Sequence, residues 1–133
     1  MSTWLSLAAA AIIAVLATLH LLYTLRDFFS QPRYFTPRDR ALLEAMRTTR
    51  VSLAPNGRDF WSALLGFHFT HSIGLLLFAL LIALSVTTPL PALRPLLIAI
   101  ALLLTWIAWR CWFHIPLAGC AAVSVLLIAG WVF

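Results

Sequence analysis

The stretch FWSALLGFHFTHSIGLLLFALLIALSV, residues 60–86, decides what kind of protein this is. It contains no charged side chain, and it is longer than the roughly 20 residues that an α-helix needs to cross the hydrocarbon core of a bilayer. A surface helix of a soluble domain is apolar on one face only, whereas this stretch is apolar around most of its circumference. The stretch therefore predicts a transmembrane helix.

Three further apolar runs complete the pattern and, with the first, predict spans at residues 4–25, 60–86, 93–109 and 117–133. The composition agrees, because 63% of the 133 residues are hydrophobic and the mean hydropathy is +1.00, whereas a soluble domain is roughly 45–50% apolar. We therefore expect an all-α fold, a four-transmembrane-helix bundle that occupies residues 1–133 as a single integral membrane domain.

The arginines are distributed unevenly between the predicted loops. The chain has no lysine, and most of its nine arginines lie between the first and second spans: Arg26, Arg33, Arg38, Arg40, Arg47, Arg50 and Arg58. Arg110 follows span three, and Arg94 is alone on the other side. Because basic loops stay in the cytoplasm, we expect a multi-pass membrane protein with both termini outside. Membrane lipids are then expected partners for this charge, and nucleic acid is not.

A short helix is predicted in the loop between the first two spans. Thr36 and Pro37 have the residue types of an N-cap and a first helical position, so the predicted helix runs from residue 37 to about residue 49. Its apolar face consists of Leu42, Leu43 and Met46. Arginines occupy much of the remaining surface, a pattern typical of a cytoplasmic amphipathic helix that lies on the membrane. Because the apolar face is short, an ordinary solvated loop helix is the alternative.

Polar side chains gather in the cytoplasmic half of the predicted bundle. At 1.5 Å per residue, His20 lies about 8 Å deep in span one, and His68 and His71 lie about 12 and 16 Å deep in span two. Helical spacing puts four residues of span one on one face: His20, Tyr23, Thr24 and Asp27. On span two, His68, His71 and Ser72 share a face. Because lipid is a poor solvent for imidazole, both faces should point into the bundle or a wet crevice.

This constellation suggests a binding site for an amphipathic molecule. Imidazoles and hydroxyls could hydrogen-bond the polar head of a lipid-like or quinone-like ligand while the spans hold its apolar tail. The residues expected to line such a cytoplasm-facing pocket are His20, Tyr23, Thr24, His71 and Ser72, with Arg58 or Arg110 attracting an anionic head. His20 or His71 would be the titrating group. The sequence assigns no catalytic residue, so whether the protein is an enzyme stays open.

Two other hypotheses compete with the pocket. His20 together with His68 or His71 could ligate a haem or a metal ion from two helices, although the spans lack carboxylates that would complete a site for a hard metal. Alternatively, the same polar residues merely join helices, and the chain is a non-catalytic partner or a homo-oligomer subunit. The residues suited to close helix packing in that case are Gly66, Thr70 and Gly74.

Several segments resemble a family of small uncharacterised bacterial four-helix integral membrane proteins. They are residues 17–24 (ATLHLLYT), 36–39 (TPRD), 43–46 (LEAM) and 66–74 (GFHFTHSIG), with Trp112-Phe113 and Pro116. The resemblance covers most of the chain and implies the four-span fold in a bacterial inner (plasma) membrane, but no established activity. It favours His20, Tyr23, His71 and Ser72 as the shared polar set. His68 departs from the family pattern, which commonly has an amide at that place.

Overall fold

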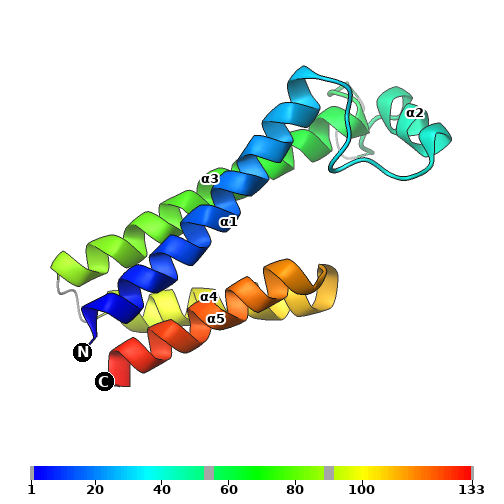
Figure 1. Ribbon diagram of the computed structural model, residues 1–133. Coiled ribbons are helices and arrows are strands. Elements are labelled where there is room, and N and C mark those ends of the chain that lie inside the picture. Colours follow the sequence, from blue (N-terminus) through cyan, green and yellow to red (C-terminus); the bar gives the residue numbers. More distant parts are fainter. Residues whose placement is uncertain (1, 53–55, 89–91, 133) are drawn as a thin grey trace. The chain divides into compact units, whose positions relative to one another are not determined.

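The computed structural model describes residues 2–52, 56–88 and 92–132. These residues form five α-helices: α1 (Thr3–Phe29), α2 (Arg40–Thr48), α3 (Phe60–Thr87), α4 (Leu93–Cys111) and α5 (His114–Val132) (Figure 1). All but the short α2 are long and apolar enough to cross a membrane. The prediction of an all-helical chain with four helices of membrane-spanning length is therefore confirmed.

The helices extend further than the predicted spans at several ends. α1 continues beyond residue 25 to Phe29, and α4 and α5 are separated only by residues 112–113, where a longer break was predicted. Pro116 does not interrupt α5 because it stands in the first helical turn, where the backbone N–H has no partner within the helix. Extending a helix satisfies backbone groups that would otherwise lie unpaired near lipid. Residues 89–91 and 133, which belong to a predicted turn and to the predicted end of span four, lie outside the described residues.

The predicted start of α2 is wrong. The helix begins at Arg40 rather than at residue 37, and Asp39, not Thr36, is its N-cap: the Asp39 carboxylate accepts a hydrogen bond of 2.9 Å from the N–H of Ala41. Aspartate is among the best N-cap residues. The preceding residues, 33–35, are held by contacts with α1 and α3 that are described below, so the chain stays extended until Asp39.

A second aspartate caps α3. The Asp59 carboxylate accepts hydrogen bonds from the N–H and the hydroxyl of Ser62, at 2.9 and 2.7 Å, and these bonds lower the pKa of Asp59. Asp59 also forms an isolated antiparallel bridge with Arg50. Capping by Asp59 fixes the point at which the loop ends and α3 begins.

The chain divides into two compact units. The apolar unit comprises Met1–Thr18 and Gly74–Phe133, and the histidine unit comprises Leu19–Ile73. Helices α1 and α3 contribute to both units. α4 and α5, within the apolar unit, form an antiparallel hairpin (Figure 1). The core of the apolar unit draws on all four long helices: Ala9, Ala10, Ile13, Phe78, Ala79, Ile82, Leu97, Ala101, Val123 and Leu127.

Small residues allow close helix contacts in the apolar unit. A Cβ atom added to Gly119 of α5 would collide with Cδ1 of Leu16 of α1. On the hairpin itself, Thr105 and Ser124 share a hydrogen bond of 3.0 Å between their hydroxyls. Close backbone approach and interhelical hydroxyl bonds are the usual means by which helices associate in lipid.

Candidate functional site

Three histidines converge within the histidine unit. His20 comes from α1, while His68 and His71 come from one face of α3. The Nε2 atom of His20 lies 3.0 Å from Nδ1 of His68, a hydrogen-bond distance. The centroid of the His20 ring lies 5.0 Å from that of His68 and 5.3 Å from that of His71. The site therefore joins two helices through imidazoles, and each ring is half-buried.

Two buried hydroxyls brace the histidine backbone. The Thr24 hydroxyl donates to the carbonyl of His20 at 2.8 Å, and the Ser72 hydroxyl donates to the carbonyl of His68 at 2.8 Å. Both residues are fully buried. Such bonds to the preceding turn hold the hydroxyl protons within the helix and adjust its local geometry. Thr24 and Ser72 therefore support the backbone of the histidines from within their own helices.

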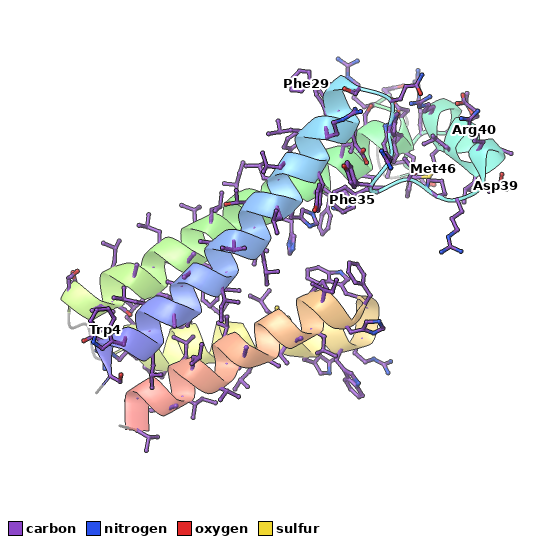
Figure 2. The ribbon with its side chains drawn as sticks, in the orientation of Figure 1. Trp4, Phe29, Phe35, Asp39, Arg40 and Met46 are labelled. Carbon is purple, nitrogen blue, oxygen red and sulfur yellow. The ribbon has the colours of Figure 1, made fainter. Side chains whose placement is uncertain are left out.

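A phenylalanine from the loop covers the histidines. The ring of Phe35 stacks on His68, with centroids 4.2 Å apart and an angle of 22° between the ring planes, and its centroid lies 4.7 Å from that of His20. Figure 2 labels Phe35 on the segment between α1 and α2. On the α3 side, the ring of Phe67 is nearly parallel to that of His71, at 6.1 Å. Aromatic faces thus flank the imidazoles.

The Asp27 carboxylate fixes the loop that carries Phe35. Its Oδ1 accepts from the N–H groups of Arg33 (2.8 Å) and Tyr34 (3.1 Å), and its Oδ2 accepts from those of Tyr34 (3.0 Å) and Phe35 (2.8 Å). Asp27 is only 2% exposed although it is an acidic residue. Charge-assisted bonds to three successive backbone donors are stronger than neutral ones. Asp27 therefore clamps residues 33–35 against the end of α1.

The sequence signalled Asp27 only as the last member of a polar stripe. Its role as a loop clamp was missed, as was the presence of Phe35 at the site. The one sequence signal for the clamp was an acidic residue placed near the end of an apolar helix, followed by a loop with proline at Pro32 and Pro37. Nothing in local periodicity indicates which backbone groups such a carboxylate binds.

The structure brings together some of the predicted pocket residues and not others. His20 lies against both His68 and His71, whereas Thr24 and Ser72 bond backbone carbonyls of their own helices. Tyr23 instead stacks on Tyr34 of the loop, with ring centroids 4.4 Å apart and an angle of 19°. Tyr23 thus holds the loop rather than facing the imidazoles.

The two arginines proposed at the entrance have different settings. Arg58 is exposed and belongs to the histidine unit. Arg110 belongs to the apolar unit, where its guanidinium lies 5.9 Å from the centroid of the Trp109 ring, a cation–π distance. Of these two arginines, Arg58 is therefore the one that belongs to the same unit as the histidines.

The geometry does not form a metal centre within residues 2–52, 56–88 and 92–132. No group of three or more His, Cys, Asp or Glu side chains there could hold a metal ion. The facing nitrogens of His20 and His68 illustrate the reason: at 3.0 Å one nitrogen donates its proton and the other accepts it, so neither nitrogen is directed at a common ion.

A small pocket lies elsewhere, in the apolar unit. Its lining includes Ser6, Ser85, Arg94 and Trp131. Sequence analysis had singled out Arg94 only as the lone arginine of the second loop. The residues that line this pocket are thus different from those of the histidine site.

The chain has no match among protein-family models, curated proteins or solved structures. The residues of the site are therefore the basis on which a function can be proposed.

Proposed function

We propose that this protein binds an amphipathic quinone-like or lipid-like molecule at the histidine site, within a bacterial inner membrane. The observation that carries the proposal is the convergence of His20, His68 and His71, from two apolar helices, beside the rings of Phe35 and Phe67. Imidazoles are costly to place in a membrane-spanning helix, and polar groups at such positions commonly mark functional sites.

The chemistry of the site suits a ring that bears carbonyl groups. A neutral imidazole offers one N–H donor and one acceptor, so His20 or His71 could donate a hydrogen bond to a ligand oxygen. Aromatic neighbours favour a flat head group, and the apolar surfaces of α1 and α3 would accommodate a hydrocarbon tail. No reaction needs to be invoked for this role, and the proposal is one of binding.

The proposed orientation places the histidine unit towards the cytoplasm and both termini outside, following the excess of arginine in residues 26–58. The features of α2 support a position on the membrane surface. No residue of α2 is buried in the chain, and Leu42 is 51% exposed. A helix that leaves apolar residues uncovered and carries arginine fits an interface with anionic lipids. Arg58 would then attract the anionic head of a ligand.

Loss of a co-purifying ligand tests the proposal. The protein would be purified in a mild detergent, and its bound molecules identified by absorption and native mass spectrometry. We expect a quinone or lipid to be retained by the wild type and by the control variant His114→Ala, and to be lost from His71→Ala with helix content and melting temperature unchanged. Retention of the ligand by His71→Ala would contradict the proposal.

A second candidate function is that of a non-catalytic helix-bundle partner or oligomer subunit. It is favoured by the open surface at Gly66 and Gly74, where an added Cβ would meet no atom within 4 Å. Such a surface suits close approach of a second helix. In this case the histidines only join α1 to α3, and His71→Ala lowers stability by about 0.6–2 kcal/mol without loss of a ligand. A monodisperse monomer in mild detergent would contradict the subunit role.

A further inference from the structure

We infer that Phe35 is an internal occupant of the histidine site, and that a planar ligand ring binds by displacing it. This inference rests on the proposed function and narrows it, because it favours a quinone ring over a lipid head group. The observation behind it is that the loop places a flat, six-membered ring on the imidazole pair where a ligand ring would stack.

The contacts of Phe35 are those of a ligand rather than of a core residue. Its ring stacks on His68 at 4.2 Å and lies 4.7 Å from His20, so that it touches both members of the hydrogen-bonded imidazole pair. Phe35 is only half-buried, and it comes from a segment without regular secondary structure. A side chain with these features can leave its place without unfolding either helix.

The loop is held by two contacts that do not involve the histidines. Asp27 accepts hydrogen bonds from the N–H groups of Arg33, Tyr34 and Phe35, and Tyr34 stacks on Tyr23. Because the N–H of Phe35 itself is bound to the carboxylate, the clamp and the position of the ring are coupled. Weakening the clamp should therefore release the ring from the imidazoles.

A phenyl ring leaves hydrogen-bonding capacity unused at this position. Phe35 stacks its face on His68 and has only C–H groups around its rim, whereas a 1,4-quinone of the same ring size would also stack and would carry carbonyl acceptors on its rim. The added hydrogen bonds are what would allow a quinone to compete with a ring that is tethered nearby. A glycerol-based head group cannot stack, so it has no means of replacing the phenyl ring.

Tethering makes Phe35 an intramolecular competitor. Only molecules in which Phe35 has left the histidine site can bind the ligand. When they are a fraction of the population, the apparent dissociation constant rises by the inverse of that fraction. Removing the competitor should therefore tighten binding of a ring-shaped ligand without adding any contact to it.

The test measures binding of 2-methyl-1,4-naphthoquinone to the detergent-solubilised full chain. We expect Phe35→Ala to bind on the order of tenfold more tightly than the wild type, and Asp27→Asn to fall between the two. Asp39→Asn is the matched control, because Asp39 caps α2 and asparagine caps nearly as well, so its affinity should equal that of the wild type. Phe35→Leu, which keeps an apolar side chain but cannot stack, should also bind more tightly and serves if Phe35→Ala fails to fold.

A second measurement needs no quinone. Diethyl pyrocarbonate modifies exposed imidazoles, and peptide mass spectrometry gives the rate at His68. Asp27→Asn should raise this rate severalfold, whereas Asp39→Asn should leave it unchanged.

The outcomes separate this inference from the proposed function. Equal quinone affinity of the wild type and Phe35→Ala, lost in both cases on His71→Ala, would overturn the displacement and leave the binding site intact. Weaker binding by Phe35→Ala would make Phe35 part of the wall and would also overturn the displacement. Absence of quinone binding in every variant would overturn the proposed quinone site and the displacement together. An unchanged His68 modification rate in Asp27→Asn would overturn the coupling between clamp and ring.

Discussion

The same two helices are joined by different forces in the two units. In the apolar unit, α1 and α3 meet through alanines and aliphatic side chains such as Ile13 and Ile82. In the histidine unit they meet through His20 and His68, and the same unit contains buried polar groups. Lipid provides no hydrophobic drive for helix association, so the first contact depends on close packing and the second on directed hydrogen bonds. A single helix pair can therefore contain both a packed region and a polar region that is available for binding.

Burial of polar groups emphasises the difference. In the histidine unit the buried polar residues are Thr24, Asp27 and Ser72. Each has an assigned hydrogen-bond partner, two on their own helix and one on the loop. A buried polar group without a partner costs free energy. These residues therefore limit the arrangements of helix and loop to those in which their hydrogen bonds can form. The apolar unit buries Ser85 and Ser124, which bond carbonyls of their own helices, and the aliphatic side chains of its core restrict it mainly by volume.

The largest expected effect on stability comes from a substitution in the packed region. Ile82 is fully buried in the core of the apolar unit, so Ile82→Ala should lower the free energy of unfolding by about 3 kcal/mol through a cavity and lost contacts. Leu80→Ala is the control on the same helix, since Leu80 is 52% exposed and should cost little. Reversible unfolding in mixed micelles measures both. A cost at Ile82 no greater than that at Leu80 would show that this core is not tightly packed.

The next largest effect on stability comes from a substitution in the polar region. Asp27→Ala leaves the N–H groups of residues 33–35 without their acceptor, and we expect a loss of about 2 kcal/mol because a loop near the membrane surface can recover some hydrogen bonds from water. Hydrogen exchange should accelerate at Tyr34 and Phe35. Asp39→Ala should instead affect α2 alone. Unchanged exchange at residues 34 and 35 would contradict the clamp.

A pair of glycines sharpens the comparison. Gly119→Val should destabilise the apolar unit by about 1–3 kcal/mol, because its side chain would overlap Leu16 and force it to move. Gly66→Ala should be neutral or stabilising by up to about 1 kcal/mol in a monomer, because the added methyl meets open space and alanine favours helix. Melting temperatures at fixed detergent concentration compare them. Destabilisation by Gly66→Ala, together with a fall in oligomer mass, would instead reveal a second chain at that surface.

The smallest effect concerns pH at the start of α3. Because hydrogen bonds from Ser62 lower the pKa of Asp59 below its ordinary value of 3.8, the cap contributes stability above about pH 3.8 and loses it as the pH falls through the folded-state pKa. The stability difference between the wild type and Asp59→Ala should therefore shrink between pH 5 and pH 3. Asp59 is exposed to solvent at the carboxylate, so the effect is modest. A difference independent of pH would contradict the role of the charged cap.

Local pattern in the sequence accounts for much of this molecule. Apolar runs longer than a helix needs to cross a membrane predicted four helices near their observed positions, because hydropathy over a window needs no knowledge of neighbours. Helical spacing also placed His68 and His71 on one face of the second span, and both rings lie against His20 in the structure. The predicted start of α2 was wrong because two capping residues competed, and the path of the preceding chain decided between them.

Only the tertiary structure decided which groups meet. His20 and His68 are separated by 48 residues, and their contact depends on the register of α1 against α3. Asp27 reaches residues 33–35, and Phe35 reaches the imidazoles, because the loop folds back on α1. Periodicity determines which face of a helix a residue occupies, since that follows from backbone geometry alone. The partner of that face depends on where other segments lie, and the free energy that selects it is shared among all of them.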